Sequence, residues 1–522
     1  MGWNRYHLFF AVVYMALLLL VGVLAGRRKR DSNQFLNATG ALPLAVCIVA
    51  AIAANCGSLD VIAMMALGAQ YGLLACHFYW IGAVPALLVL VFWLLPAFAH
   101  GRYPSLLDYI ARHYGRETRS VVALCMATTM LLLAGVCLCA VAQLVMTFLG
   151  WSFLQGVLAT APVVLFYTWM GGFRATVYTE LLHFAAVLVA VVPLLFFVLH
   201  DFGGLASLQA HLPAARAHLW QTLPFLAPQA TMDRFGLIFG LGIVLSFGYW
   251  STDFVQLQRA LAVRRAQDVQ YVPLAQAAAK LVFAFLIVLP GVAAPLVLTG
   301  RDAGNWNATL PSLMLHYYSP FWAALGVLGL TACLVATFAN NVSGFSSAWM
   351  QGIYRPWIRP QATEPHYLRM SQISNATAVV LSIGAAYVAL RYQSLMDYVQ
   401  MIFSTFNAPL FAVVALAALV PRRVARGGLG GFALGLLSTV LHQVLVRAGM
   451  LHYGGQMSAN FYSAILGFVC AIVITLLLGH VRPALNADAG SAARPRLRFS
   501  PPVVLLALGI AAVCLALNVV FR

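Results

Sequence analysis

The sequence predicts an all-α integral membrane protein with about fourteen transmembrane helices. Of its 522 residues, 62% are hydrophobic and only 8% are charged, whereas about 25% of the residues in a typical soluble domain are charged. Long apolar stretches recur along the whole chain, near the length of about 20 residues that a helix needs to cross a bilayer. These stretches are continuous rather than alternating, which excludes an outer-membrane barrel.

The predicted helices follow one another through polar connections. Their ranges are 6–25, 42–70, 73–99, 119–149, 152–170, 175–199, 234–258, 274–299, 319–350, 371–390, 397–420, 429–448, 459–480 and 500–520. The first apolar run precedes the basic residues 27–30 instead of following them, so we expect a membrane helix rather than a cleaved signal peptide. Residues 104–114 are amphipathic and are expected to lie along the inner interface.

Basic residues indicate the orientation of the chain. With the amino terminus outside, the inner loops hold 22 of the 30 Lys and Arg residues. The positive-inside rule then predicts a protein of the cell (inner) membrane with both termini facing outward. Because apolar runs separate the basic groups, we expect a lipid bilayer and no nucleic acid as partner, despite a net charge of +17.

Two predicted helices carry a polar, glycine-containing interruption. Asp60 follows one of them (Asn55-Cys56-Gly57-Ser58), and Asp253 follows the other. The two helices are five apart in order, which predicts a core of five-plus-five inverted repeats with a broken first helix in each. The predicted parts are a leading helix and cytoplasmic linker (1–41), the first repeat (42–199), an outer loop (200–233), the second repeat (234–420) and three C-terminal helices (421–522).

Polar groups at these breaks point to a binding site, because irregular backbone survives at membrane depth only around a protected cavity. Three of the thirteen carboxylates, Asp60, Glu180 and Asp253, fall within or beside apolar spans, where an ionised group is costly and usually functional. The alternative is that Asn55 and Ser58 only satisfy a kinked backbone and that Asp60 and Asp253 lie at water-exposed helix ends.

Lys280 and Glu180 each allow two interpretations. Lys280 opens the eighth helix and either snorkels to the inner surface or reaches into the cavity, to pair with Asp253 or a substrate hydroxyl. Glu180 has His183 one turn later on the same helical face. Such a pair can bind a cation or relay a proton, and the alternative is structural burial with mutual hydrogen bonding.

No resident cofactor or enzymatic activity is expected. The nine cysteines lie inside apolar segments without the spacing of a disulfide framework or a zinc site. Residues 426–431 (RGGLGG) lack the Gly-Lys-Ser/Thr ending of a nucleotide-binding loop. Transport energy would therefore come from an ion gradient.

Several segments resemble one family over nearly the whole chain. They are residues 53–72, 78–80, 171–180, 307–315 and 397–400, and above all Tyr249-Trp250-Ser251-Thr252-Asp253 followed by Gln258-Arg259-Ala260-Leu261. This pattern resembles the sodium:solute symporter family and, within it, the sodium/sugar cotransporter branch.

The resemblance implies a sodium site and an ion pathway. The family's sodium ligands would be carbonyls at Ala53, Cys56 and Cys333, with two hydroxyl positions falling on Ala336 and Thr337. One hydroxyl is therefore missing, which should weaken sodium binding unless water or a carbonyl replaces it. Glu180 occupies the place of an aspartate near the family's sodium pathway.

The resemblance also implies a solute site. The family's cavity positions fall on Asn55, Asp60, Asp253, Lys280 and Gln400, with Tyr79 in place of a glutamate. Asp60 stands where relatives carry Gln or His, which argues against simple glucose or galactose and favours another sugar, a polyol or an amine-bearing solute. The aromatic groups Phe78, Trp80, Tyr249 and Trp250 would supply stacking faces, or would serve only as helix contacts.

The predicted function is a secondary active symporter that couples inward sodium movement to uptake of a small polar solute, a sugar or polyol, by alternating access. Two alternatives stay open: a proton-coupled symporter that uses Glu180 and His183, and a solute sensor that keeps the transporter fold. The sequence predicts no oligomeric state.

Overall fold

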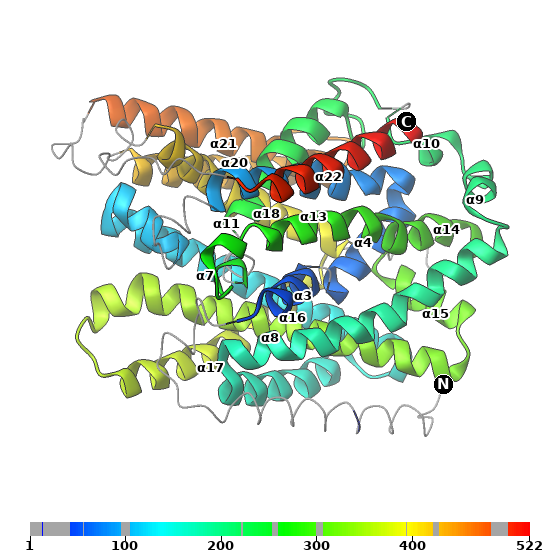
Figure 1. Ribbon diagram of the computed structural model, residues 1–522, viewed down its shortest axis with the longest axis horizontal. Coiled ribbons are helices and arrows are strands. Elements are labelled where there is room, and N and C mark those ends of the chain that lie inside the picture. Colours follow the sequence, from blue (N-terminus) through cyan, green and yellow to red (C-terminus); the bar gives the residue numbers. More distant parts are fainter. Residues whose placement is uncertain are drawn as a thin grey trace.

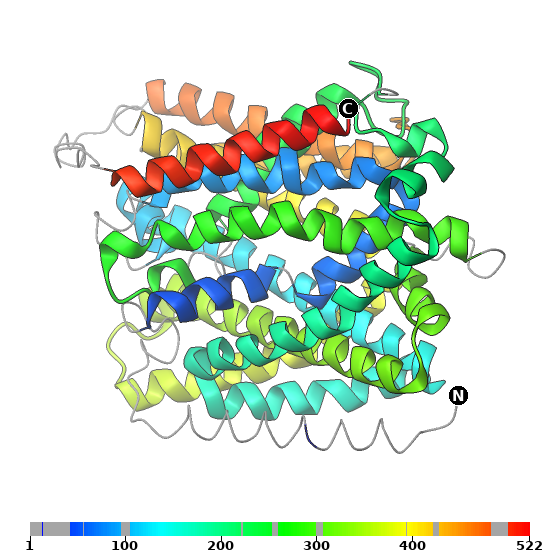
Figure 2. The same cartoon turned by 45° about the vertical axis from the view of Figure 1, so that its right-hand side comes forward.

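The computed structural model describes residue 13 and residues 42–55, 57–95, 105–220, 223–252, 259–298, 306–392, 394–420, 427–481 and 499–522. The side chains of residues 58, 94, 166–177, 179, 266 and 481 lie outside this description. In this part of the chain, long helices run side by side along one common direction (Figures 1 and 2). The predicted helix 6–25 lies outside the described residues, apart from Val13.

The first half of the described chain begins with two short helices that meet at a break and continues into longer ones. Its elements are α3 (Leu44–Asn55), α4 (Ser58–Tyr71), η1 (Gly72–Cys76), η2 (Phe78–Ala83), α5 (Val84–Val89), η3 (Leu90–Leu94), α7 (Leu106–Leu149), α8 (Phe153–Asp201), α9 (Leu205–His211) and α10 (Ala214–Ala217).

The second half ends in three helices at the periphery of the bundle. Its elements are η4 (Gly236–Ser246), α11 (Phe247–Thr252), η5 (Ala266–Asp268), α13 (Tyr271–Phe283), η6 (Ala284–Val288), α14 (Leu289–Val297), η7 (Trp306–Ala308), α15 (Thr309–Tyr317), α16 (Pro320–Trp349), η8 (Met350–Ile358), α17 (Glu364–Ala389), α18 (Leu395–Leu419), α20 (Gly428–Arg447), α21 (Gln456–Val481) and α22 (Pro501–Val520).

The predicted class, an all-α multi-pass membrane protein, is confirmed. Within the described residues, ten helices are long and apolar enough to cross a membrane, and four shorter apolar helices accompany them. The described residues therefore support between ten and fourteen membrane spans. The division into two inverted repeats and the orientation of the termini stay predictions.

Two predicted spans, 152–170 and 175–199, lie within one helical element. The backbone is helical throughout α8, a segment of 49 residues, and two parts of it, Phe153–Leu165 and Glu180–Asp201, are separate apolar stretches that could enter a membrane. The division near residues 171–174 stays a prediction, and the helical backbone continues through the Gly171-Gly172 pair. Glycine disfavours a helix by only about 1 kcal/mol and keeps its amide donor, so a glycine pair alone does not force a helix to end.

A sharp kink at Gly115 divides α7 into a short first part and a long second part. Gly115 has a φ of 85° inside the helical segment, a conformation that glycine adopts without the penalty of a Cβ atom. Ser105 caps the start of the helix by accepting from the amide of Asp108 at 3.3 Å. The kink falls between the predicted amphipathic segment 104–114 and the predicted span 119–149.

The break predicted near Asp60 is present. α3 ends at Asn55, α4 begins at Ser58, and Gly57 between them is extended, with φ −73° and ψ 175°.

The second predicted interruption, the polar stretch 247–252 before Asp253, is instead helical and forms α11 (Phe247–Thr252) directly after η4. Its hydroxyls are compatible with a helix, because Thr252 donates to the carbonyl of Gly248 one turn earlier at 2.6 Å. Residues 253–258, which include Asp253, lie outside the described part of the chain.

Close packing fixes α4 against α14. A Cβ atom at Gly291 would lie 2.1 Å from the carbonyl oxygen of Met65, and one at Gly68 would lie 2.6 Å from that of Val288. Small residues permit such backbone approach between membrane helices. The helix that carries Asp60 therefore rests on a rigid support.

The outer loop predicted at residues 200–233 includes α9 and α10 and folds back over the bundle. Trp220 donates its indole N–H to Asn518 at 3.3 Å, and the amide of Leu219 donates to the carbonyl of Phe521 at 3.0 Å. The carbonyl of Leu219 in turn accepts from His77, between η1 and η2, at 3.0 Å. Residues 205–220, here called the strap, thus connect α22 to the end of α4.

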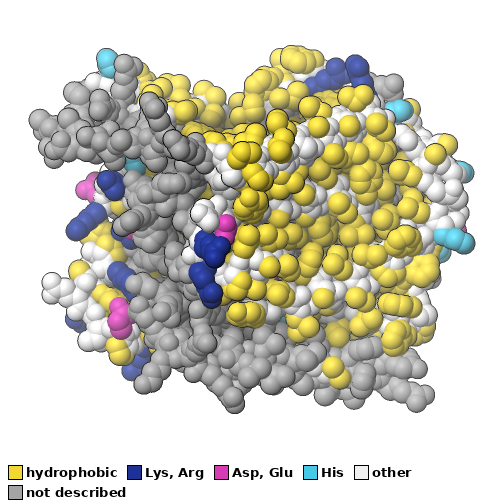
Figure 3. Space-filling view, viewed as in Figure 1, with side chains coloured by type: hydrophobic (Ala, Val, Ile, Leu, Met, Phe, Trp, Pro, Cys, Tyr) yellow, Lys and Arg dark blue, Asp and Glu magenta, His cyan; other side chains and the backbone are white. Residues whose placement is uncertain are grey.

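Apolar side chains cover much of the outer surface (Figure 3). In α22, Leu505 and Leu515 are each 68% exposed and Val519 is 73% exposed, as expected for a helix that faces lipid rather than water.

Candidate functional site

An internal cavity of about 160 Å³ lies beside the break between α3 and α4. One water needs roughly 15 Å³ of such space, so the cavity has room for an organic solute. Its lining comes from α3, α4, η2, α7, η4, α11, α13, α16 and α18. Among the predicted site residues, the cavity brings together Asn55, Asp60, Tyr79, Tyr249, Lys280, Thr337 and Gln400.

Asp60 and Lys280 form an ion pair in the cavity wall. Lys280 Nζ lies 2.9 Å from Asp60 Oδ2, and the same oxygen accepts from the hydroxyl of Tyr79 at 2.7 Å. The ammonium of Lys280 also lies 4.4 Å from the centre of the Tyr79 ring, which is within the range of a cation–π contact. Of the two interpretations of Lys280, the structure favours the cavity, where Asp60 is one partner; Asp253 lies outside the described residues.

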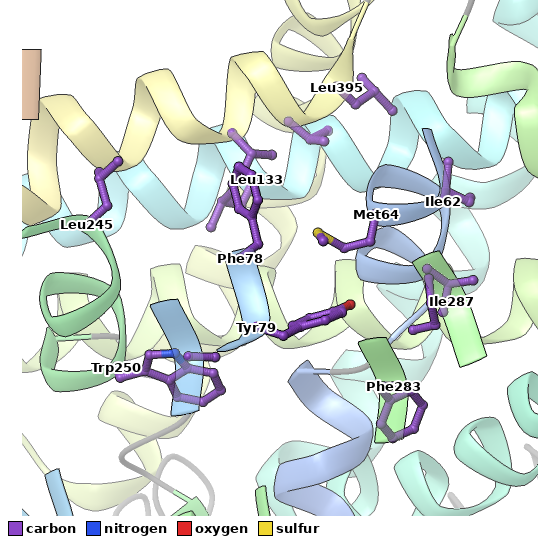
Figure 4. Close-up of a cluster of buried hydrophobic side chains, with 14 of the residues drawn as sticks. Ile62, Met64, Phe78, Tyr79, Leu133, Leu245, Trp250, Phe283, Ile287 and Leu395 are labelled. Atoms are coloured by element: carbon purple, nitrogen blue, oxygen red, sulfur yellow. The ribbon is translucent and has the colours of Figure 1, made fainter. Parts of the chain in front are cut away.

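Tyr79 holds its place by packing as well as by hydrogen bonding. It is 2% exposed and lies across the buried cluster with its hydroxyl end directed away from Trp250 (Figure 4). The turn that carries it, η2, is π-helical, and such turns are frequent at functional sites. The Tyr79 hydroxyl thus orients the carboxylate of Asp60.

Amide groups face the same cavity from two other helices. Asn55 Nδ2 donates to the hydroxyl of Tyr249 at 3.0 Å. The carbonyl oxygens of the Asn55 and Gln400 side chains are buried and have no hydrogen-bond partner in the described part of the molecule. A buried acceptor without a partner costs about 1–3 kcal/mol, so these oxygens are suited to accept a donor from a bound solute.

The predicted sodium ligands surround Gly57 at the break. A Cβ atom placed on Gly57 would lie 2.9 Å from Thr337 Oγ1, 3.3 Å from Cys333 Sγ and 3.5 Å from the carbonyl oxygen of Ala53. Thr337 donates its hydroxyl proton to the carbonyl of Cys333 at 3.0 Å, which leaves the lone pairs of Oγ1 available to a cation. Ala336 is buried beside them and offers only its carbonyl, and Cys56 lies outside the described residues.

Glu180 lies in a buried ion pair. Both of its carboxylate oxygens accept from Arg259, one from Nε at 3.0 Å and the other from Nη2, and Asn340 donates to it at 2.6 Å. Glu180 is 2% exposed and Arg259 is 1% exposed. An internal cation therefore balances its charge, and the predicted role of Glu180 on an ion pathway stays a prediction that requires this pair to open. His183 is equally buried, at 2% exposed.

The structure places Trp80 differently from the other expected aromatic residues. Phe78, Tyr249 and Trp250 line the cavity. Trp80 instead packs on Phe285 and Phe521, with ring centres 5.5 and 5.9 Å apart. Trp80 is thus a helix contact, because it follows Tyr79 by one residue and therefore points to a different face of the helical turn.

Two contributions were missed at the sequence level. Arg259 was counted among the basic residues of an inner loop, although its apolar neighbours Ala260-Leu261-Ala262 set it apart from the Arg264-Arg265 pair. Met396 and Phe403 line the cavity together with Gln400 on α18. Their spacing of four and three residues from Gln400 places them on one helical face. The sequence therefore contained the signal that they lie on the same side of the helix as Gln400.

Comparisons with known proteins agree with this architecture. The model of the sodium:solute symporter family matches residues 35–435. The chain is 22% identical to a sodium/glucose cotransporter of Vibrio parahaemolyticus over 450 residues, which cover 80% of this chain and 81% of the relative. It is 24% identical to sodium/myo-inositol cotransporter 2 of Rattus norvegicus over 468 residues, covering 83% and 69% of the two chains.

A solved structure shows the same fold. The substrate-bound, outward-open structure of a Na⁺-coupled sialic acid symporter superposes with a TM-score of 0.77 at 15% identity, and the match covers 92% of this chain and 99% of that one. The family match spans more than half of the chain and agrees with a bundle of apolar helices around a polar cavity. The chain therefore belongs to the sodium:solute symporter family and is a multi-pass membrane transporter rather than an enzyme.

Proposed function

We propose that this protein uses the inward movement of sodium to drive uptake of a small polar solute, a sugar or polyol, through the cavity at the α3–α4 break. The low identity to the sodium/glucose and sodium/myo-inositol relatives leaves the particular solute open. The proposal includes alternating access, in which the cavity opens to one side of the membrane at a time.

The observation that carries the proposal is the position of Gly57. The groups around it, Thr337 Oγ1 and the Ala53 carbonyl, are oxygen donors of the kind that a desolvated sodium ion needs. Asn55 and Asp60, two and three residues away along the chain, face the cavity. One broken helix thus supports both the ion site and the solute site.

This arrangement gives the coupling a physical route. A sodium ion between α16 and the break would link the two helices and fix the backbone that positions Asn55 and Asp60. Solute binding would then be stronger with the ion present, and ion binding would be stronger by the same factor with solute present. Both effects should disappear when the ion ligands are removed.

The test is uptake into liposomes that contain the purified protein. Under an inward sodium gradient at a fixed voltage, we expect accumulation of at least one labelled sugar or polyol. Thr337→Ala should raise the sodium concentration for half-maximal uptake at least tenfold, because it removes the one hydroxyl among the expected ligands. Uptake driven by a proton gradient alone, without sodium, would contradict the proposal.

Thr128→Ala is the matched control. Thr128 donates to the carbonyl of Leu124 at 2.9 Å, the same one-turn contact that Thr337 makes with Cys333, but on the outer side of α7. This variant loses a helix hydroxyl without touching the cavity, so its sodium dependence should match that of the unmodified protein.

A further inference from the structure

Two large apolar side chains are exposed at the end of a membrane-crossing segment. The segment Pro320–Ile358, which consists of α16 and η8, is long and apolar enough to cross a membrane, and so is α17, which begins at Glu364. The connection between the two segments must therefore lie at or beyond one surface of the bilayer. At this connection Trp357 is 54% exposed and Ile358 is 51% exposed.

Hydrogen bonds fix Trp357 beside α7. Its indole N–H donates to Ser120 Oγ at 2.6 Å, and the Ser120 hydroxyl donates to the carbonyl of Gly352 at 2.9 Å. The part of α7 that follows its kink therefore lies next to η8. The indole is held at its polar edge while much of its ring stays exposed. Tryptophan is enriched at membrane–water interfaces for this combination of an apolar ring and a polar N–H.

The depth of Trp357 in the bilayer follows from its contact with α7. The exposed large apolar side chains of α7 begin at Leu124, which is 51% exposed and lies one turn beyond Ser120. One turn of α-helix rises about 5.4 Å, and the headgroup layer on each side of the hydrocarbon core is roughly 5–7 Å thick. The ring that is bonded to Ser120 therefore lies at the level of the lipid headgroups.

Positive charge borders this apolar pair. Arg359 follows it directly along the chain, Arg116 lies one turn before Ser120, and both arginines are exposed. The two segments that meet here, residues 105–120 and 350–370, hold six Arg residues and three carboxylates, which is a formal excess of three positive charges. Figure 3 shows Lys and Arg side chains at this end of the molecule, on the left of the view. The interfacial patch is defined here as Arg116, Trp357, Ile358 and Arg359.

We propose that the interfacial patch binds the headgroup of an anionic phospholipid. The guanidinium groups of Arg116 and Arg359 would hold the phosphate, because a guanidinium offers parallel N–H donors that match phosphate oxygens. Trp357 and Ile358 would contact the glycerol region and the first carbons of the acyl chains. A soluble anion would make only the charged contacts, and a zwitterionic lipid would bring its own ammonium group towards the arginines. The inference does not rest on the proposed function, because the patch is separate from the cavity.

The experiment measures binding of an acyl-labelled fluorescent phosphatidylglycerol to the purified full chain in a neutral detergent. Unlabelled phosphatidylglycerol should displace the probe at a concentration at least tenfold lower than phosphatidylcholine does, and millimolar inorganic phosphate should not displace it. The double variant Arg116→Gln/Arg359→Gln should weaken the affinity for the probe at least tenfold, because basic residues at the bilayer surface attract anionic lipid. Trp357→Ala should weaken it at least threefold.

Matched controls lie at the opposite ends of the same helices. Arg391 is exposed just beyond the far end of α17, and Trp322 is 38% exposed at the start of α16. Arg391→Gln and Trp322→Ala each remove the same kind of side chain as the test variants. Their affinity for the probe should equal that of the unmodified protein.

Three results would overturn the proposal. Equal displacement by the two lipids, or test variants that bind like the controls, would exclude a headgroup site at the patch. Displacement by inorganic phosphate would show a site for soluble anions. A smaller assembly in Trp357→Ala, without lipid binding, would show that a second copy of the chain covers the patch. The substituted side chains are exposed, so the unfolding temperature should stay unchanged; if the double variant does not fold, Arg359→Gln alone serves as the test.

Discussion

Glu180 and Arg259 neutralise each other in the interior, and neither tolerates the loss of its partner. Both are almost fully buried, and an uncompensated charge at such a site costs roughly 3–5 kcal/mol. We therefore expect Glu180→Gln and Arg259→Gln each to lower the unfolding temperature in detergent by several degrees. The double variant should be more stable than the sum of the two single losses predicts, because it leaves no charge behind.

The more exposed ion pair Asp108–Arg119 is the control for the buried pair Glu180–Arg259. Its side chains are 29% and 20% exposed, and an ion pair that water can reach contributes only about 0–1 kcal/mol. Asp108→Asn should therefore change the unfolding temperature little. Strictly additive losses in the Glu180 and Arg259 variants would show that the buried pair acts as two independent residues.

Residues that belong to local motifs were predictable, and residues whose role depends on a distant partner were not. Asn55, Asp60 and Thr337 stand out because polar groups are costly in apolar membrane helices and usually have a function there. The Glu180–Arg259 contact joins residues 79 positions apart, so no spacing rule reveals it. For the same reason the partner of Lys280, 220 positions from Asp60, was left open between a carboxylate and a solute.

At the scale of elements, the contact between α4 and α14 should be sensitive to a single methyl group. In Gly291→Ala the new Cβ would lie 2.1 Å from the carbonyl oxygen of Met65, so the helices must separate. Overpacking of this kind costs about 1–3 kcal/mol. We expect a lower unfolding temperature and, because α4 carries Asp60, weaker solute binding.

Gly509→Ala in α22 is the matched substitution, since a Cβ there meets no atom within 4 Å. Alanine is the better helix former, so this variant should be at least as stable as the unmodified protein. Equal behaviour of the two variants would contradict the close packing of α4.

Most helices were predictable because a long apolar run strongly indicates a membrane helix. The breaks and π-helical turns within these helices were harder to predict. The sequence located the break after Asn55 because Gly57 and two polar residues interrupt an apolar run. The π-helical turns η2, η3, η4, η6 and η8 leave no mark on composition, because residues of the same kinds also form α-helices.

At the scale of the molecule, the strap connects α22 to the segment between η1 and η2. The Leu219 carbonyl accepts from His77 at 3.0 Å, and the Leu219 amide donates to the carbonyl of Phe521 at 3.0 Å. His77 is fully buried, and a buried acceptor that loses its donor costs about 1–3 kcal/mol.

We expect His77→Leu to lower the unfolding temperature in detergent, because the Leu219 carbonyl loses its donor. His77→Gln retains a donor for this carbonyl, so its unfolding temperature should lie closer to that of the unmodified protein. Equal unfolding temperatures for the two variants would contradict a stabilising role of the contact.

The arrangement of the whole molecule was the least predictable level. α4 and α22 are both apolar, yet α4 is packed within the bundle while α22 exposes most of its side chains. Hydropathy does not separate the two cases, because lipid and a protein interior are similarly apolar. The family resemblance therefore indicated the arrangement of the helices better than composition did.

The ion site expected at the Gly57 break has an electrical consequence. Because the protein returns to its starting state after each cycle, its own charges, including those of Asp60 and Lys280, add no net charge movement. If the solute is neutral, the charge that crosses the membrane in each cycle is that of the sodium alone. A membrane potential of 100 mV then adds about 2.3 kcal/mol per ion to the driving force. Uptake would generate an inward current, and the ratio of that current to solute flux would count the ions moved per cycle.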